Sequence, residues 1–118
     1  MCIRDRSKAD ALYAVTDNIV ASAAGLIAKS TIERGLISIA AEEGPVKGGL
    51  LMTDGLSYYE LGKQTGAMAK KILVDKVSPK DLPVESLKNT TKIVNENTMK
   101  KLKLEKTNPA FEGAIFIK

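Results

Sequence analysis

The chain has 118 residues, of which 44% are hydrophobic and 27% charged, so the composition predicts one globular domain with one core. It contains no His and a single Cys, Cys2, which excludes Cys/His zinc sites, Ser–His–Asp triads and internal disulfide frameworks. No apolar run approaches the roughly 18 residues of a membrane span, and no basic-then-apolar signal segment opens the sequence.

The net charge of +4 is spread unevenly along the chain. Residues 1–60 carry six basic and eight acidic side chains, and residues 61–118 carry twelve basic and six acidic ones. A basic half raises the question of nucleic acid as a partner. The lysines stand singly or in pairs among acids, however, which favours an ordinary solvated surface and no nucleic-acid partner.

The first part of the chain alternates between strand and helix patterns. Residues 11–15 form an apolar run that predicts a buried strand, and a polar turn over residues 16–18 follows it. Residues 19–34 are Ala-rich with apolar positions three and four apart, which predicts one amphipathic helix ending at Gly35. Residues 36–41 predict a second strand. This order is typical of a βαβ unit in an α/β fold.

A Gly- and Pro-containing loop over residues 42–49 leads to a third strand expected over residues 50–53. A parallel crossover usually takes about a dozen residues or more, and this connection has only eight. Two arrangements remain open: the third strand lies at an edge after a short helical detour, or the pair is antiparallel.

Ser57 and Glu60 form a capping box that predicts a helix reaching about residue 75. The lysines of this segment fall on the opposite side from its apolar residues, as in an amphipathic helix. The apolar side chains that share one face are Leu61, Met68, Ala69, Ile72 and Leu73.

The second half of the chain gives weaker patterns. Pro79 and Pro83 bracket an extended linker. Residues 90–94 alternate as a strand does, and residues 95–102 predict a short helix that begins at an Asn cap. Residues 114–117 are apolar enough for a last strand.

Polar side chains follow the ends of all three expected strands in the first half. If these strands are parallel, the polar residues gather at the carboxyl edge of the sheet, where open α/β sheets bind ligands. Four carboxylates there would favour an ammonium group, a metal ion or a polyol and disfavour phosphate. The sequence also lacks a Gly-rich phosphate loop. The residues concerned are Thr16, Asp17, Asn18, Glu42, Glu43 and Asp54.

These residues also have ordinary structural interpretations. Asp17 is a good helix N-cap, and the acidic pair after the second strand suits a solvated turn. Asp54 precedes a glycine, which is a common turn pair. Tyr58, in a first helical turn, is more often a packing residue than a ligand contact.

Three segments occur in the same order in one known family: residues 10–18, with Thr-Asp-Asn at the end, residues 41–44 (Ala-Glu-Glu-Gly), and residues 57–66, from Ser57-Tyr58-Tyr59-Glu60 to Gly66. Over residues 9–104 the chain resembles the C-terminal portion of the ABC-transporter substrate-binding proteins associated with tryptophan and tyrosine uptake.

The resemblance implies a type I periplasmic-binding fold, whose lobe is three-layered and Rossmann-like, with a mostly parallel sheet flanked by helices. It implies a two-lobed protein that closes on a small ligand, with this chain as most of the second lobe and the segments returning near the hinge. The implied ligand is an amino acid or a similar amine-bearing solute. Asp17 would hold its amino group, Glu42 or Glu43 would enter the cleft, and Tyr58 completes the expected set.

The resemblance also divides the chain and suggests its setting. Residues 1–8 would be a non-native or truncated start, residues 9–104 the second lobe, and residues 105–118 a C-terminal tail. The implied partners are the small ligand, a membrane permease and the missing N-terminal lobe of the same protein. The implied location is extracytoplasmic, in the periplasm or on a membrane-anchored lipoprotein. No enzymatic activity and no cofactor are expected.

Two other hypotheses stay open at this point. The chain could be the effector-binding lobe of a sugar-repressor-type transcriptional regulator, which shares this fold. It could instead be a carboxylate-dependent enzyme or switch that gathers Asp17, Glu42 and Asp54 around Mg²⁺.

Overall fold

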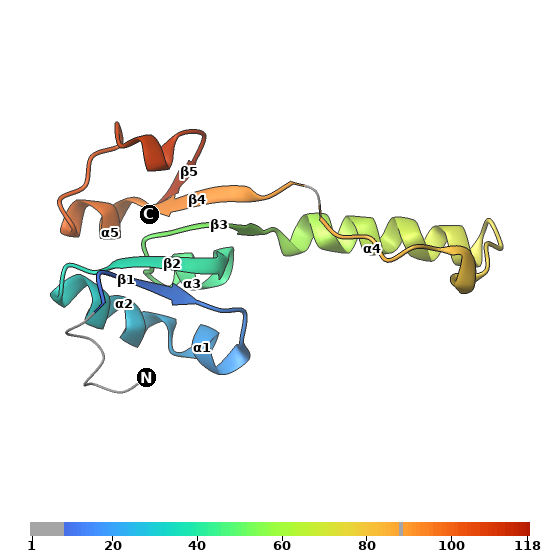
Figure 1. The fold of residues 1–118 in the computed structure, drawn as a ribbon, viewed down its shortest axis with the longest axis horizontal. Coiled ribbons are helices and arrows are strands. Elements are labelled where there is room, and N and C mark those ends of the chain that lie inside the picture. The colour runs from blue at the N-terminus through green and yellow to red at the C-terminus, as the bar shows by residue number, and fades with distance from the viewer. Residues whose placement is uncertain (1–8, 88) are drawn as a thin grey trace.

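The computed structural model describes residues 9–87 and 89–118, which form one five-stranded sheet with helices around it (Figure 1). The strands lie side by side in chain order. They are β1 (Ala11–Ala14), β2 (Ile37–Glu42), β3 (Met52–Leu56), β4 (Thr91–Asn95) and β5 (Ile115–Ile117). The α-helices are α1 (Asn18–Ser22), α2 (Ala24–Glu33), α3 (Glu43–Lys47), α4 (Tyr58–Leu73) and α5 (Glu96–Lys101).

The sheet is mostly parallel, which confirms the predicted α/β class. β1, β2 and β3 run parallel to one another, β4 is antiparallel to β3, and β5 is parallel to β4. The short connection from β2 to β3 contains α3, a helix of five residues. Of the two arrangements left open by the sequence, the antiparallel pair is wrong and the helical detour is present. The expected edge position was wrong, because β3 lies in the middle of the sheet between β2 and β4.

The helix predicted over residues 19–34 is two helices, α1 and α2, which meet at Ala23. Ala23 has φ −93° and ψ 6°, outside the α-helical region, so the axis changes there. The break leaves α1 without a buried residue while α2 packs against the sheet. Gly35, with φ +65°, ends the segment as predicted.

The two faces of the sheet carry separate apolar clusters. Because Ala40, Thr53 and Ile93 are register partners, their side chains share one face, which α2 and α3 cover. Met52, Val94 and Phe116 share the other face. The first cluster comprises Ala14, Ala24, Ala28, Ala40, Val46, Leu50 and Ile93. The second comprises Leu51, Val94, Met99 and Phe111.

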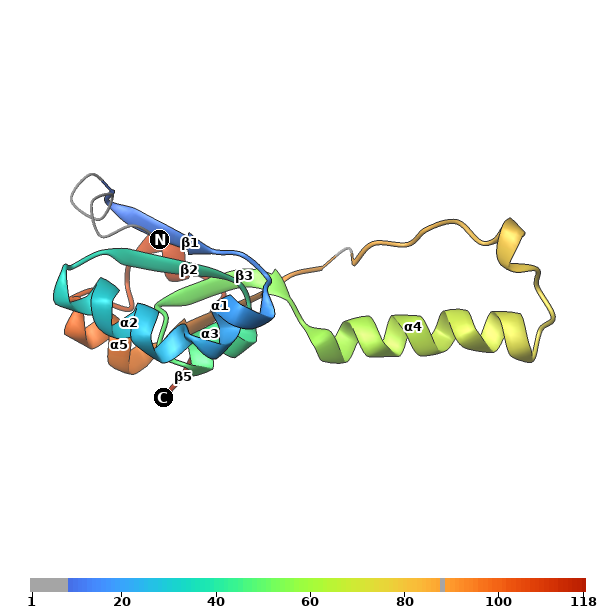
Figure 2. The ribbon, with the colours of Figure 1, turned by 90° about the horizontal axis from the view of Figure 1, so that it is seen from below.

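One part of the chain stands away from the sheet (Figures 1 and 2). Helix α4 projects from the end of β3, and the chain then returns beside it toward β4. We call residues 58–87 the arm, and residues 9–57 and 91–118 the body. The radius of gyration is 17.7 Å, whereas a compact domain of this length has one of about 13–14 Å. The arm accounts for the difference.

The helices of the described residues include none that is both long enough and apolar enough to cross a membrane.

Candidate functional site

The carboxyl ends of β1, β2 and β3 point the same way, as expected for a ligand-binding edge. Figure 1 shows α1 and α4 leaving the sheet at this end. The seven predicted ligand-binding residues lie in β2, β3, the turn after β1 and the first turns of α1, α3 and α4, and the structure gives them different surroundings.

The turn after β1 is exposed and serves first as a helix cap. Asp17 Oδ1 accepts hydrogen bonds from the backbone N–H groups of Ile19, at 2.8 Å, and Val20, at 3.1 Å. Asp17 is therefore the N-cap of α1, which the sequence predicted as its structural role. Thr16 and Asn18 beside it are exposed as well.

The two acids at the end of β2, Glu42 and Glu43, differ in burial and in their ion pairs. Glu43 lies in the first turn of α3 and pairs with Lys47 at 3.4 Å. Glu42 is only 8% exposed, although it is acidic. No ion pair joins it to any cation of the described residues. Glu42 is thus a nearly buried carboxylate without a positive partner in this part of the chain.

A bulge brings the start of α4 beside Glu42. The pairing of β2 with β3 shifts between Ala40 and Glu42, so that Glu42 faces Leu56. Gly55 permits this shift, because a Cβ there would lie only 2.7 Å from the carbonyl carbon of Ala41. The close approach of these two backbones therefore requires glycine.

Tyr58, the first residue of α4, reaches Glu42 across this bulge. Interaction with the Glu42 carboxylate raises the pKa of Tyr58 above its ordinary value, first through hydrogen bonding to the hydroxyl; desolvation and the negative charge of Glu42 act in the same direction. The residue as a whole stays 48% exposed. The structure thus brings together two of the predicted site residues, from β2 and α4.

Asp54 is not at a strand end, contrary to the prediction. The third strand runs to Leu56, so Asp54 lies inside it, opposite Lys92 of β4. Its Oδ1 accepts a hydrogen bond of 2.6 Å from the Thr90 hydroxyl. Alternation along the strand places it on the other face of the sheet from Thr53. The predicted third strand was shifted toward the N-terminus because Leu50 and Leu51 belong to the core but precede the strand.

Thr53 is a buried polar residue near this site that was not predicted from the sequence. It is 1% exposed, and its hydroxyl oxygen has no hydrogen-bond partner among the described residues. A Cβ on Gly55 would lie 2.8 Å from this oxygen, so Thr53 faces the bulge. A single Thr within an apolar strand gives no signal of this kind in a sequence.

The hypothesis of a magnesium site is not supported. Within residues 9–87 and 89–118, no three acidic or Cys side chains come close enough together to hold a metal ion. Asp17, Glu42 and Asp54 therefore do not form the expected cluster, since one caps a helix, one contacts Tyr58 and one lies inside β3.

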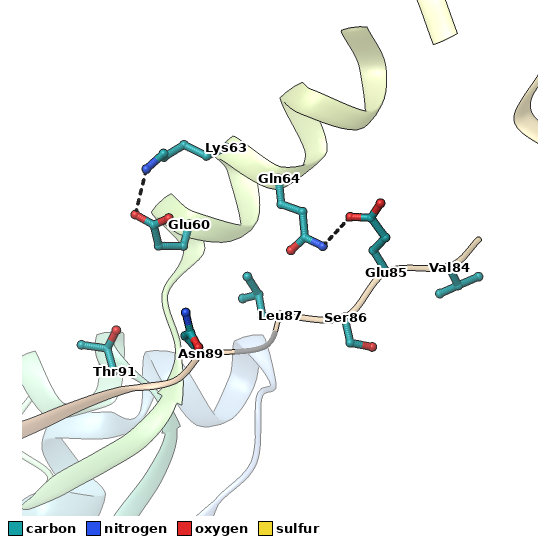
Figure 3. Close-up of a pocket in the computed structure, with 9 residues that line it drawn as sticks. All are labelled: Glu60, Lys63, Gln64, Val84, Glu85, Ser86, Leu87, Asn89 and Thr91. Carbon is teal, nitrogen blue, oxygen red and sulfur yellow. Dashed lines mark hydrogen bonds and ion pairs between the residues drawn. The ribbon is translucent and has the colours of Figure 1, made fainter. Parts of the chain in front are cut away.

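An open groove of about 920 Å³ lies between α4 and the returning chain (Figure 3). Gln64 Nε2 donates a hydrogen bond of 2.9 Å to Glu85, and Lys63 pairs with Glu60 at 3.2 Å. Leu87 and Thr91 also line it. The groove belongs to the arm and its junction with the body, and it was not predicted.

A mostly parallel sheet with polar residues at its carboxyl edge, and an arm leaving from that edge, defines an α/β lobe of the ligand-binding type. Comparison with known proteins identifies the family. The profile of the ABC transporter substrate binding protein family matches residues 4–110, and the chain belongs to this family. The match is wider at both ends than the 9–104 expected from the sequence.

Individual relatives agree with this assignment. The chain is 39% identical over 99 residues to the tyrosine-binding protein of Clostridioides difficile, covering 84% of this chain and 28% of that protein. A ligand-free, open structure of a substrate-binding protein with adhesive properties from Clostridium difficile has 41% identity and a TM-score of 0.76, over 98% of this chain and 38% of that one.

A third comparison supports the fold alone. The ABC domain from Streptococcus pneumonia, in complex with L-Trp, has 22% identity and a TM-score of 0.79, over 95% of this chain and 38% of that one. The chain thus spans less than two fifths of the length of each of these proteins. The family match favours the substrate-binding hypothesis over the transcriptional regulator.

Proposed function

We propose that this chain is one lobe of a two-lobed solute receptor of an ABC importer, which binds an amino acid or a similar amine-bearing solute in the cleft between its lobes. One observation carries the proposal: the arm leaves the body at the same sheet edge where Glu42 meets Tyr58. A second lobe seated on the arm would face this polar edge across a cleft.

The arm supplies the argument for the second lobe. Helix α4 has 16 residues and buries none of them, although one of its faces is apolar. Helices in proteins gain most of their stability from packing such a face. On this face Leu61, Met68, Ala69 and Ile72 are only partly buried, and Leu73 is 68% exposed. The N-terminal lobe of the same protein fits this role, since the relatives are more than twice as long.

The ligand class rests on the family and on the chemistry of the edge. A relative of 39% identity is named a tyrosine-binding protein, and the edge presents carboxylates rather than phosphate-binding groups. Closure of the lobes would desolvate an ammonium group against a carboxylate, a contact worth about 1.5–3 kcal/mol. No bond is made or broken. The proposed contact residues are Thr16, Asp17, Asn18, Glu42, Glu43, Asp54 and Tyr58.

A receptor of this kind works outside the cytoplasmic membrane and delivers its ligand to a membrane permease. We include both the extracytoplasmic location and the permease in the proposal on the strength of the family.

The test begins with the genomic DNA upstream of codon 9, which should encode an in-frame first lobe. The full-length protein is then titrated calorimetrically with a panel of L-amino acids, including L-tyrosine and L-tryptophan. We expect at least one to bind and to raise the unfolding temperature in proportion to the logarithm of its concentration. An upstream helix-turn-helix segment, or no binding by any member of the panel, would contradict the proposal.

A further inference from the structure

We infer that Glu42, rather than Asp17, is the counter-ion of the ligand's ammonium group, and that the Tyr58 hydroxyl holds the Glu42 carboxylate in position. This inference rests on the proposed function and deepens it, because it assigns the residue that makes the receptor specific for amines.

Burial distinguishes Glu42 from the other acids at the edge. A carboxylate that loses most of its water loses favourable solvation unless a cation or several hydrogen-bond donors replace it. Glu42 is 8% exposed, and none of the described lysines or arginines pairs with it. An arriving ammonium group would supply the missing positive charge at a site already desolvated.

The other three acids at this edge already make interactions within the chain. Asp17 is exposed and uses Oδ1 to cap α1, and Glu43 already pairs with Lys47. Asp54 accepts a hydrogen bond from Thr90 and lies inside β3. Of the four acids, only Glu42 is both buried and without an ion pair to a cation of the described residues.

Tyr58 fits the role of a positioning residue. The strand register places the start of α4 beside Glu42, and the Tyr58 hydroxyl interacts with its carboxylate. The carboxylate has several lone pairs, so it can also accept a hydrogen bond from an ammonium group. The backbone beneath is held by the close contact of Gly55 with Ala41, which fixes the start of α4 against the end of β2. The half-exposed Tyr58 stands where the arm begins, so it lies at the mouth of the proposed cleft.

The experiment compares ligands with and without an amine in the full-length protein. Calorimetry measures the affinity of L-tyrosine, of L-tryptophan and of 3-(4-hydroxyphenyl)propionate, which is tyrosine without its amino group. Glu42→Gln keeps the shape of the side chain and removes its charge. We expect it to weaken amino-acid binding at least about tenfold and to leave the affinity for the deaminated acid within about twofold of wild type.

Further variants separate the competing assignments. Tyr58→Phe should weaken amino-acid binding about three- to tenfold, because it removes only the positioning hydroxyl. Glu33→Gln is the matched control: this exposed acid ends α2 at the opposite edge of the sheet, and binding should not change. Unfolding should confirm that Glu42→Gln folds, with a melting temperature equal to or above that of wild type. Glu42→Asp, which keeps the charge but shortens the side chain, should bind with intermediate affinity.

The outcomes are distinguishable. If the wild-type protein binds no amino acid, the proposed function fails and the inference fails with it. If the wild-type protein binds L-tyrosine or L-tryptophan and Glu42→Gln binds it equally well, the inference alone is wrong. A large loss in Asp17→Asn together with none in Glu42→Gln would return the counter-ion role to Asp17.

Discussion

The body and the arm are made of similar residues but differ in what covers them. In the body, β2 alternates between partly and fully buried positions, and the buried polar side chains of Ser38 and Asn95 make hydrogen bonds to other segments. In the arm, a longer helix buries no residue, and the return segment is joined to it mainly through Glu85, which pairs with Lys71 at 3.4 Å and accepts from Gln64.

The difference shows where this lobe is complete and where it depends on another. Surface ion pairs such as Lys71–Glu85 contribute about 0–1 kcal/mol, which does not replace a packed apolar face. The body contains packed apolar clusters, whereas the arm has an apolar face on which no residue is fully buried. Within the 118-residue chain, where the arm is uncovered, substitutions should therefore have large effects in the body and small ones in the arm, and the following changes test that contrast.

The largest effect is expected at Gly55. Gly55→Ala places a Cβ against the backbone of Ala41, which cannot move without breaking the pairing of β2 with β3. We expect a loss of about 3 kcal/mol in the free energy of unfolding, measured by urea denaturation. Gly62→Ala in α4 is the matched control. Nothing lies within 4 Å of its Cβ position, and alanine favours a helix, so stability should rise by up to about 1 kcal/mol. Equal losses in both variants would contradict the contrast.

Two helix caps give the next comparison. Asn95 is buried, donates to the carbonyl of Val46 at 3.0 Å, and accepts from the backbone N–H of Thr98 at 3.0 Å. Asn95→Ala leaves both groups unpaired, so we expect a loss of about 2 kcal/mol in chemical denaturation. Ser57→Ala removes the cap of α4, whose hydrogen bond from Glu60 is long at 3.5 Å, and should cost about 0.5 kcal/mol. A larger loss for Ser57→Ala would show that the arm is as integrated as the body.

The smallest effect concerns a charge cluster in the body. Lys106 lies 2.7 Å from Glu96 and lowers the pKa of this carboxyl below its ordinary value, with a smaller contribution from Lys100. A lowered pKa in the folded state stabilises the protein above the unfolded pKa, and the contribution is lost as the pH falls through the folded pKa. Lys106→Met keeps an apolar stem over Phe116, which lies 4.6 Å from the ammonium group, and removes the charge.

The wild-type protein should therefore be slightly more stable than Lys106→Met near neutral pH, and the difference should disappear under acidic conditions below the Glu96 pKa. Unfolding followed at several pH values measures this directly. A difference that stays constant from neutral to acid would mean that packing on Phe116, rather than the ion pair, is responsible.

Much of the fold was predictable because local patterns and tertiary packing agree. The switch between strand and helix periods located β1, β2, α4 and β4 to within a few residues, and Asn95 caps α5 as predicted. The capping box at Ser57 is only half formed, since Ser57 accepts from the Glu60 N–H while the Glu60 side chain pairs with Lys63.

The candidate site was less predictable, because it depends on register. The contact between Glu42 and Tyr58 follows from a one-residue shift in strand pairing at Gly55, and neither residue encodes that shift locally. The same cause misplaced Asp54, whose position depends on where β3 begins. Glu42 is buried by the alternation along β2, whereas Glu43 begins α3, and their adjacent places in the sequence conceal this difference.

The most direct test of the account is amide hydrogen exchange in the full-length protein. If a second lobe covers the arm, the amides of α4 from Leu61 to Ile72 should exchange as slowly as those of β2, because both would open only with the whole structure. Exchange in α4 at the rate of an isolated solvent-exposed helix, while β2 stays protected, would contradict the claim that the arm is one side of the interface between the lobes.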